Sequence, residues 1–309
     1  MPLEKGEKIL ANIATVVVGK AEALELVLVA LLAGGHALLE DVPGVGKTLI
    51  AKSLARSVSG SFKRIQFTPD LLPADVTGFN TYDQKTGHFR FQPGPVFTNI
   101  LLADEINRAI PRTQSSLLES MEEHQVTVDG STMPLPTPFF VLATQNPIEL
   151  EGTFPLPEAQ LDRFLLKIGL GYPERSEELA IMERFQTHDP LAEVLPVTDP
   201  ECLREMQRAC RSVRVSAPVR EYIADLVAAT RRHENLRFGA SPRGSLGLMH
   251  AGQCLASLHH RNYVLPDDIK RLVIPVLAHR IILNEEARQD GKGPEEILED
   301  IIMHIPVPA

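Results

Sequence analysis

A glycine-containing turn between an apolar run and a helical segment constrains this chain more than any other feature. Residues 37–39 are typical of a buried strand, and residues 49–55 have the spacing of a helix. Between them, Gly44 and Gly46 allow the backbone to turn its N–H groups inward. Lys47 would begin the helix, where the dipole disfavours a cation unless an anion is bound as well. The turn therefore predicts a phosphate-binding loop at the end of a strand.

The residues around this turn also suit a nucleotide triphosphate with Mg²⁺. Thr48 supplies the hydroxyl that a phosphate-bound Mg²⁺ needs. The usual loop of this kind begins with a further glycine, and here that position is Asp41, so an ordinary glycine-rich strand–helix turn is the alternative. We expect nucleotide contacts from Asp41, Val42, Pro43, Gly44, Val45, Gly46, Lys47, Thr48 and Leu49.

Two further strand-like segments end in polar residues. Residues 99–103 lead into Asp104 and Glu105, and open α/β sheets bind ligands at the carboxyl ends of their strands. Asp104 can hold the Mg²⁺ shell together with Thr48, and Glu105 is placed to polarise a water molecule. A solvated Asp-Glu turn is the alternative, which the order and spacing of the two motifs disfavour.

A third strand-like segment ends in a neutral amide. Residues 139–144 are followed by Asn146, which could orient a water against the γ-phosphate. Taken alone, Asn-Pro at positions 146 and 147 would be read as a turn. As the third polar strand end in a series, Asn146 is predicted to belong to the same site.

The pattern along the chain predicts two domains. Residues 1–172 alternate strand-like and helix-like segments, which is typical of a three-layer α/β domain with a parallel five-stranded sheet. Residues 173–309 have helical periodicity throughout and are expected to form an all-α domain. Two β-hairpins are expected near residues 79–91 and 125–135. The expected strands lie near 36–40, 64–67, 99–103, 138–144 and 164–168, and the later helices near 174–186, 199–211, 216–232, 242–260, 265–283 and 294–303.

Composition excludes several classes of protein. The formal charge of −9 argues against a general nucleic-acid-binding surface, which needs a basic face. The most apolar stretch, residues 26–33, is too short to span a bilayer, and the N-terminus lacks a signal layout, so we expect a cytoplasmic protein. Three cysteines without CxxC spacing read as buried thiols, and ten scattered histidines do not suggest a protein metal site.

Two arginines occupy positions where a cation needs an explanation. Arg163 precedes the last expected strand, and Arg243 follows Ser241-Pro242 in the first turn of an expected helix, where it opposes the dipole. An anionic partner is one explanation. A surface salt bridge is the other, for Arg163 with the adjacent Asp162, and spacing alone favours it.

Taken together, these motifs resemble the MoxR group of AAA+ ATPases over nearly the full chain. The resemblance implies an α/β three-layer P-loop NTPase domain followed by an all-α lid domain, binding ATP and Mg²⁺. It is carried by residues 40–48, 66–73, 103–109, 114–123, 143–147 and 152–164.

The resemblance also implies roles for single residues. Asn146 would be sensor 1, Arg163 the arginine finger given to a neighbouring subunit, and Arg243 the sensor 2 arginine of the lid, coupling nucleotide to lid position. Gly19 and Lys20 fall where the family lines the adenine pocket. The two hairpins resemble insertions that often line the central pore of a ring.

Members of this group commonly form hexamers and act as chaperone-like ATPases that mature or activate protein complexes. They often work with a partner that carries a von Willebrand factor A domain, which would have to be a separate chain here. The ATPase subunit of a metal chelatase would share every motif, and only its partner would discriminate. A DNA-associated motor is disfavoured by the acidic charge, a catalytically dead scaffold by Lys47, Asp104, Glu105 and Asn146 together, and a GTPase by the lack of a base-reading Asn-Lys-x-Asp motif.

Overall fold

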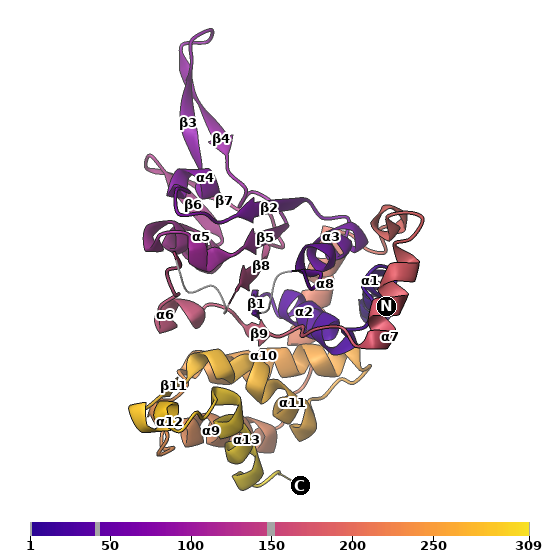
Figure 1. The fold of residues 1–309 in the computed structure, drawn as a ribbon, viewed down its shortest axis with the longest axis vertical. Helices are drawn as coiled ribbons and strands as arrows, with labels where there is room; N and C mark the ends of the chain where they lie inside the picture. The colour runs from indigo at the N-terminus through magenta and orange to yellow at the C-terminus, as the bar shows by residue number, and fades with distance from the viewer. Residues whose placement is uncertain (1, 41–43, 147–151, 309) are drawn as a thin grey trace.

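A five-stranded parallel sheet forms the centre of the N-terminal part of the molecule (Figure 1). The computed structural model describes residues 2–40, 44–146 and 152–308, so the expected loop residues Asp41, Val42 and Pro43 lie outside it. The strand order is β2-β5-β8-β1-β9, and every neighbouring pair is parallel. Strand β8 therefore separates β1 from β5. The strands are β1 (Ala37–Glu40), β2 (Phe62–Gln66), β5 (Ile100–Asp104), β8 (Phe140–Gln145) and β9 (Leu166–Ile168).

Alternating strand residues pack into two separate layers. Leu39, Leu102 and Leu142 belong to a core shared with α1 (Pro2–Ala14), α2 (Ala21–Leu32) and α3 (Lys47–Ser57). Their neighbours Leu38, Leu101 and Val141 pack on the opposite face with α5 (Pro111–Glu123). A strand shows its side chains to alternate faces, so runs that are apolar throughout become buried on both sides. The predicted three-layer α/β fold is confirmed.

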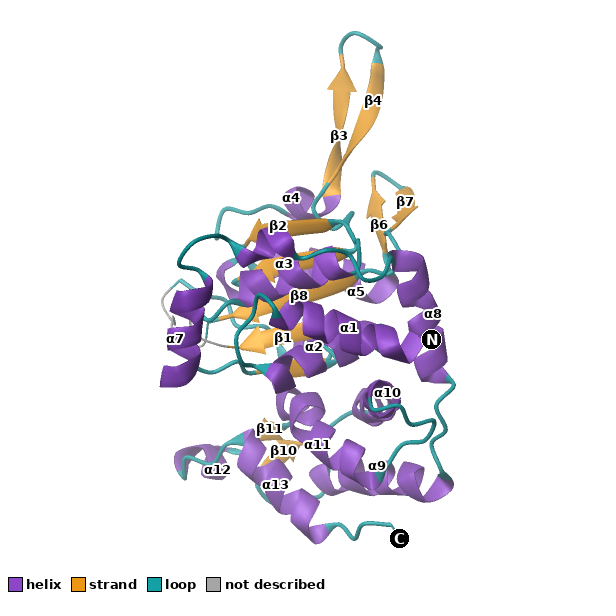
Figure 2. Cartoon of the chain, turned by 90° about the vertical axis from the view of Figure 1, so that its right-hand side faces the viewer, coloured by secondary structure: helices purple, strands orange, loops and turns teal. Residues whose placement is uncertain are grey.

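Two β-hairpins extend from the sheet domain (Figure 2). The longer one pairs β3 (Gly78–Asp83) with β4 (His88–Pro93), and the shorter one pairs β6 (Gln125–Val128) with β7 (Ser131–Pro134). Asp129 and Gly130 both have positive φ, which is the conformation that a tight type I′ hairpin turn requires. Asn80 Nδ2 donates to Asp129 Oδ2 at 2.8 Å and links the two hairpins. They lie where the sequence predicted hairpins.

The C-terminal part is mainly helical. Asp199, Ser216 and Ser241 each accept a backbone N–H in the first turn of a helix, and each is followed by proline at the next position or the one after it. The longer helices are α7 (Arg175–Arg184), α8 (Pro200–Arg211), α9 (Ala217–Thr230), α10 (Pro242–Leu258), α11 (Pro266–Leu277) and α13 (Pro294–His304). Short elements elsewhere are α4 (Pro73–Thr77), η1 (Ile106–Arg108), α6 (Glu158–Leu161), η2 (Pro190–Glu193), η3 (Ala278–Arg280) and α12 (Glu285–Gln289).

One helix is shorter than the sequence predicted. The helix expected over 265–283 ends at Leu277, because the chain continues into η3 and then into strand β11 (Ile282–Leu283). This strand pairs antiparallel with β10 (Leu236–Phe238), and Asn284 N–H donates to Asn235 O at 3.0 Å. The pairing joins segments far apart in sequence, so local periodicity could not reveal it.

The helical part and the sheet share one hydrophobic core. Leu28 of α2, Met206 of α8 and Leu255 of α10 are at most 2% exposed and belong to the cluster that covers one face of the sheet. The domain limit expected at residue 172 stays a prediction, since this core runs across it. Within the described ranges, no helix is long and apolar enough to cross a membrane. Cys202, Cys210 and Cys254 are buried and not disulfide-bonded.

His36, directly before β1, is a buried polar residue that joins α5 to β8. Its Nε2 lies 3.1 Å from Met121 O, and its Nδ1 accepts the Val141 N–H at 3.0 Å, so the ring is a neutral donor–acceptor pair. Burial lowers the pKa of His36 from 6.5 to about 4.

Acid should therefore weaken the fold through this ring. The unfolded chain takes up a proton near pH 6.5 while the folded chain resists until about pH 4, so stability is lost as pH falls through this window. We expect the free energy of unfolding to fall by roughly 3 kcal/mol from this group. In urea titrations, His36→Gln should show a shallower acid slope than wild type, whereas His304→Gln, at an exposed site, should not. Equal slopes for wild type and His36→Gln would contradict this assignment.

Candidate functional site

The carboxyl ends of β2, β5 and β8 open into one cavity of about 680 Å³, which we call the strand-end pocket. Its walls come from the loop before α3, from the acidic pair after β5 and from the amide after β8. Phe185, Asp189 and Leu191, which follow α7, also line it, as do Lys52, Arg64, Gln66 and Thr144. The sequence-predicted residues that line it are Gly44, Gly46, Lys47, Thr48, Leu49, Asp104, Glu105 and Asn146. Val45 packs against the hydrophobic core instead.

The start of α3 is built to bind an anion. Gly44 and Gly46 have φ of 87° and 92°, a region that side chains rarely adopt, and no atom lies within 4 Å of where a Cβ would stand on either. Gly46 is the N-cap and provides no side-chain hydrogen bond to the first turn of α3. Because helix N-termini carry partial positive charge and N–H groups without intrahelical partners, this turn suits a phosphate group.

Thr144 orients both acidic residues and was missed by the sequence analysis. Its hydroxyl donates to Asp104 Oδ1 at 2.6 Å and accepts the Glu105 N–H at 2.8 Å. Thr144 is buried at 1% exposure on β8, directly beside β5. One hydroxyl thus fixes the Asp104 carboxylate and the backbone of Glu105, whose φ of 56° lies in the left-handed region. A threonine in an apolar strand gives little signal by itself.

The edge strand β2 places two more polar side chains against these acids. Arg64 donates to Asp104 Oδ2 from Nε at 3.1 Å and from Nη2 at 2.6 Å. Gln66 Nε2 donates to Glu105 Oε2 at 2.6 Å, and Arg108 Nη1 contacts the same oxygen at 3.1 Å. Arg64 and Gln66 occupy alternate positions of a strand that pairs with β5, which is the only sequence signal that could have identified them.

The residues present fit Mg²⁺ only together with bound phosphates. Within residues 2–40, 44–146 and 152–308, no group of three or more His, Cys, Asp or Glu side chains could hold a metal ion. Thr48 and Asp104 line the same pocket, and Mg²⁺ usually takes one or two protein ligands while phosphates and waters complete its shell. Direct binding to Asp104 Oδ2 would require Arg64 to move.

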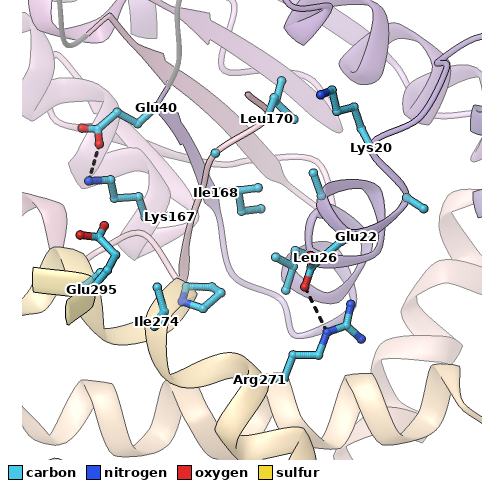
Figure 3. A pocket seen from close by; sticks show the side chains of 15 residues that line it. Lys20, Glu22, Leu26, Glu40, Lys167, Ile168, Leu170, Arg271, Ile274 and Glu295 are labelled. Atoms are coloured by element: carbon cyan, nitrogen blue, oxygen red, sulfur yellow. Dashed lines mark hydrogen bonds and ion pairs between the residues drawn. The ribbon is translucent and has the colours of Figure 1, made fainter. Parts of the chain in front are cut away.

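A second cavity of about 670 Å³ lies between α2, the ends of β1 and β9, and α11 (Figure 3). We call it the helix-side pocket. It is lined by Lys20, Leu26, Glu40, Lys167, Arg271 and Ile274, among others. Glu40 forms an ion pair with Lys167, and Arg271 pairs with Glu22 and Glu25. Glu40, which ends β1, lines this pocket, whereas Gly44 and Gly46 line the strand-end pocket.

The expected adenine-pocket residues lie at this second cavity or beside it. Lys20 lines it, donates to Tyr172 O at 2.8 Å and approaches Glu177 at 3.9 Å. Gly19 is not among its lining residues, but a Cβ there would collide with the Glu177 carboxylate. Because that carboxylate is the movable end of a side chain, the firmer reason for glycine at position 19 is its φ of 67°, which other residues rarely adopt.

The structure brings the two singled-out arginines together on one carboxylate. Arg163 Nε lies 2.9 Å from Glu122 Oε2, and Arg243 Nη2 contacts Glu122 Oε1. Neither arginine is among the described residues that line the two pockets. Each arginine therefore forms a salt bridge within the chain, as the alternative interpretation expected. Only the partner expected for Arg163 is wrong, because Asp162 is bound by the buried Arg280 instead. Glu122 was not distinguished by sequence spacing, since it lies in a run of polar residues on α5.

Comparisons with known proteins agree with this geometry. A model of the ATPase family associated with various cellular activities (AAA) matches residues 36–166, and an AAA lid domain model matches residues 228–301. Chaperone MoxR1 of Mycobacterium tuberculosis is 43% identical over 98% of this chain and 82% of its own length. Protein MoxR of Paracoccus denitrificans is 33% identical over 95% of this chain and 94% of its own. A solved candidate ATPase from Cytophaga hutchinsonii superimposes with a TM-score of 0.94 at 41% identity, covering 100% of this chain and 96% of that one.

The Thr144 hydroxyl offers a test of the acidic centre. Thr144→Val keeps the shape but leaves Asp104 Oδ1 and the Glu105 N–H without this partner. Because losing such an orienting contact typically costs about 10- to 100-fold in activity or metal affinity, we expect ATP turnover to fall by that amount. Thr144→Ser retains the hydroxyl and is the matched control. Equal turnover in both variants, at equal melting temperature, would remove Thr144 from the site.

Proposed function

This chain belongs to the MoxR family of AAA ATPases, and we propose that it hydrolyses ATP with Mg²⁺ to remodel partner protein complexes. One observation carries the proposal: the anion-binding start of α3 faces the acidic pair Asp104 and Glu105 and the amide of Asn146 in one pocket. Three neighbouring strands supply these groups, as a site that must hold phosphates and activate a water requires.

The residues that the sequence singled out in this pocket would divide the reaction among them. The first N–H groups of α3 and Lys47 bind the β- and γ-phosphates, while Thr48 and Asp104 hold the metal. When bound, Mg²⁺ neutralises charge on the phosphate oxygens. Glu105 accepts the proton of the attacking water, and Asn146 orients that water. Gln66 and Arg108 both contact Oε2 of Glu105, so its Oε1 is the oxygen that we assign to the proton.

The helix-side pocket would receive the adenosine part of the nucleotide. Its apolar wall includes Leu26 and Ile274, and Lys20 contributes to its rim. It adjoins the end of β1, from which the loop leads to the strand-end pocket. This arrangement supports one nucleotide bound across the sheet edge, with the lid helix α11 against its base.

The arginine pair supports a ring. Arg163 and Arg243 share Glu122 and lie outside both pockets of their own chain. We therefore assign them to the γ-phosphate of an adjacent subunit, with Arg163 as the arginine finger. Arg243 was expected to couple nucleotide to lid position as the sensor 2 arginine, and we now propose that it acts on the nucleotide of the neighbouring subunit instead of on its own. A hexamer is the ring size common in the family.

The work of the ring would be chaperone-like. The name of the Mycobacterium tuberculosis relative supports that role, and the long hairpin provides a surface for it. Phe79, Tyr82 and Phe89 on β3 and β4 are 45%, 57% and 72% exposed, so they could contact a client in a central pore. A cytoplasmic location and a separate partner with a von Willebrand factor A domain complete the proposal.

Two substitutions test the nucleotide site. Lys47→Ala removes the cation at the phosphates and should abolish ATP binding measured by calorimetry. Glu105→Gln should bind ATP as wild type does but hydrolyse it about 10²–10⁴-fold more slowly, the usual cost of losing one positioned general base. Wild-type affinity in Lys47→Ala, or turnover of Glu105→Gln within about twofold of wild type, would refute these roles.

A mixing experiment tests the ring. Specific activity should rise steeply with protein concentration, because a charge supplied by a neighbour can increase hydrolysis about 10³–10⁵-fold. Co-assembled Arg163→Ala and Lys47→Ala subunits should regain activity, since each supplies what the other lacks. Arg220→Ala, an exposed arginine on α9, is the control and should behave as wild type. A concentration-independent rate without rescue in co-assembled mixtures would contradict action between subunits.

A further inference from the structure

We propose that Arg280 is a positioning residue that fixes Arg163 to the lid and thereby couples nucleotide bound in one subunit to catalysis in the next. The inference rests on the proposed function of Arg163 as an arginine finger. It concerns a residue that forms part of neither pocket's lining and that sequence analysis did not single out.

Arg280 is a buried guanidinium whose hydrogen bonds go mainly to one segment of the chain, residues 162–165. Its side chain is 3% exposed, and Nε donates to Asp162 Oδ1 at 2.7 Å. Nη2 donates to Asp162 O at 3.2 Å and to Phe164 O at 2.6 Å. Nη1 donates to Leu165 O at 3.0 Å and to Val276 O in the last turn of α11. All three guanidinium nitrogens therefore donate hydrogen bonds, and most of these bonds go to residues 162–165.

These contacts enclose Arg163 from both sides. Asp162 and Phe164 are its immediate neighbours in the chain, and Arg280 holds the backbone carbonyl of each. The adjacent His279 adds a second contact, because its Nε2 lies 2.9 Å from Phe164 O. Because the peptide groups on both sides of Arg163 are bound by the lid, the lid determines the position of the Arg163 Cα atom.

A third contact joins Arg243 to the same cluster. Ser241 Oγ donates to the second Asp162 oxygen at 3.1 Å, and Ser241 is the N-cap of the helix that carries Arg243. Asp162 therefore connects Arg280, the start of α10 and the segment of Arg163. The backbones of Arg163 and Arg243 are thus joined through Asp162, and their side chains bind the same carboxylate, Glu122. We therefore expect the two arginines to move together.

The buried Arg280 guanidinium requires its hydrogen-bond partners to stay in place. Burial lowers the pKa of the Arg280 guanidinium, and only the paired Asp162 opposes that effect substantially. A buried charge needs its partners in place, so the segment cannot move away without Arg280. Lysine cannot reproduce the planar fork that reaches four acceptors on residues 162–165.

The same part of the lid also faces the nucleotide of its own chain. Arg271, Ile274 and Ala278 line the helix-side pocket, and Arg280 follows Ala278 by two residues in η3. A base bound there would press on α11 and η3, and Arg280 would transmit the shift to Arg163. The state of one nucleotide site thereby sets how well the arginine finger serves the neighbouring site.

Arg280→Lys tests the proposal in mixed rings. Misplacing a catalytic group by about 1 Å can cost 10²-fold, so we expect hydrolysis to fall by about that factor while ATP affinity stays unchanged. Mixing with Glu105→Gln, which binds ATP, hydrolyses it slowly at its own site and has Arg163 intact, should restore activity at the Arg280→Lys sites. Mixing with Arg163→Ala should not, because neither subunit then offers a well-placed finger. Rescue by Arg163→Ala instead, or wild-type activity of Arg280→Lys, would overturn the proposal.

Two further variants separate positioning from folding. Arg261→Lys is the control, because Arg261 also binds an aspartate, Asp268, at 2.6 and 2.7 Å, and none of its hydrogen bonds goes to residues 162–165. It should leave activity within about twofold of wild type. Asp162→Asn keeps the shape and one acceptor oxygen for Arg280, replaces the oxygen that accepts from Ser241 by a donor NH₂ group, and removes the charge. It should repeat the rescue pattern of Arg280→Lys if that variant does not fold. Absence of this pattern in Asp162→Asn would also overturn the proposal.

The outcome is distinguishable from failure of the proposed function. If Arg163→Ala and Lys47→Ala rescue each other while Arg280→Lys behaves as Arg261→Lys, the arginine finger stands and the role of Arg280 is refuted. If neither Lys47→Ala nor the ATP-binding Glu105→Gln rescues Arg163→Ala in rings shown to co-assemble, the action of Arg163 between subunits is refuted, and the role of Arg280 with it.

Discussion

The position of β8 between β1 and β5 is the constraint on which the site depends. In a parallel sheet all strands end at one edge, so the loop after β1, the acids after β5 and the amide after β8 meet there. The central strand also carries Thr144, whose hydroxyl binds Asp104 and the backbone of Glu105. Strand order and one buried hydroxyl thus convert three separate sequence motifs into a single acidic centre opposite an anion-binding helix start.

Carboxylates organise the arginines in the rest of the molecule. Asp104 holds Arg64 inside the strand-end pocket, Glu122 holds Arg163 and Arg243 outside it, and Asp162 holds Arg280 at the junction with the lid. The first pair limits direct access of a metal to Asp104. Glu122 and Asp162 determine where the Arg163, Arg243 and Arg280 side chains lie relative to the lid. A chain with net negative charge can in this way present a local cationic surface to a neighbour's phosphates.

The sequence predicted what depends on local pattern. The three-layer fold, the glycine-containing loop, the acidic strand end and the proline-started helices all follow from strand and helix periodicity and from capping. It did not predict Arg64, Gln66, Glu122 or Arg280, because each acts through a partner distant in the chain. The ion pair of Arg163 is an example. Its sequence neighbour Asp162 was the expected partner, but Asp162 binds the buried Arg280, and Arg163 binds Glu122. The pairing of β10 with β11 was not predicted either, because the two strands are far apart in the sequence.

The central claim is that one chain binds the nucleotide while the arginine pair of another completes the site. An experimental structure of the assembled Glu105→Gln variant with ATP and Mg²⁺ would test it most directly. We predict Lys47 and Thr48 of one subunit on the phosphates, and Arg163 of the adjacent subunit within hydrogen-bond distance of the γ-phosphate, having left Glu122. Occupied sites in which every Arg163 remains on Glu122 of its own chain would contradict the account.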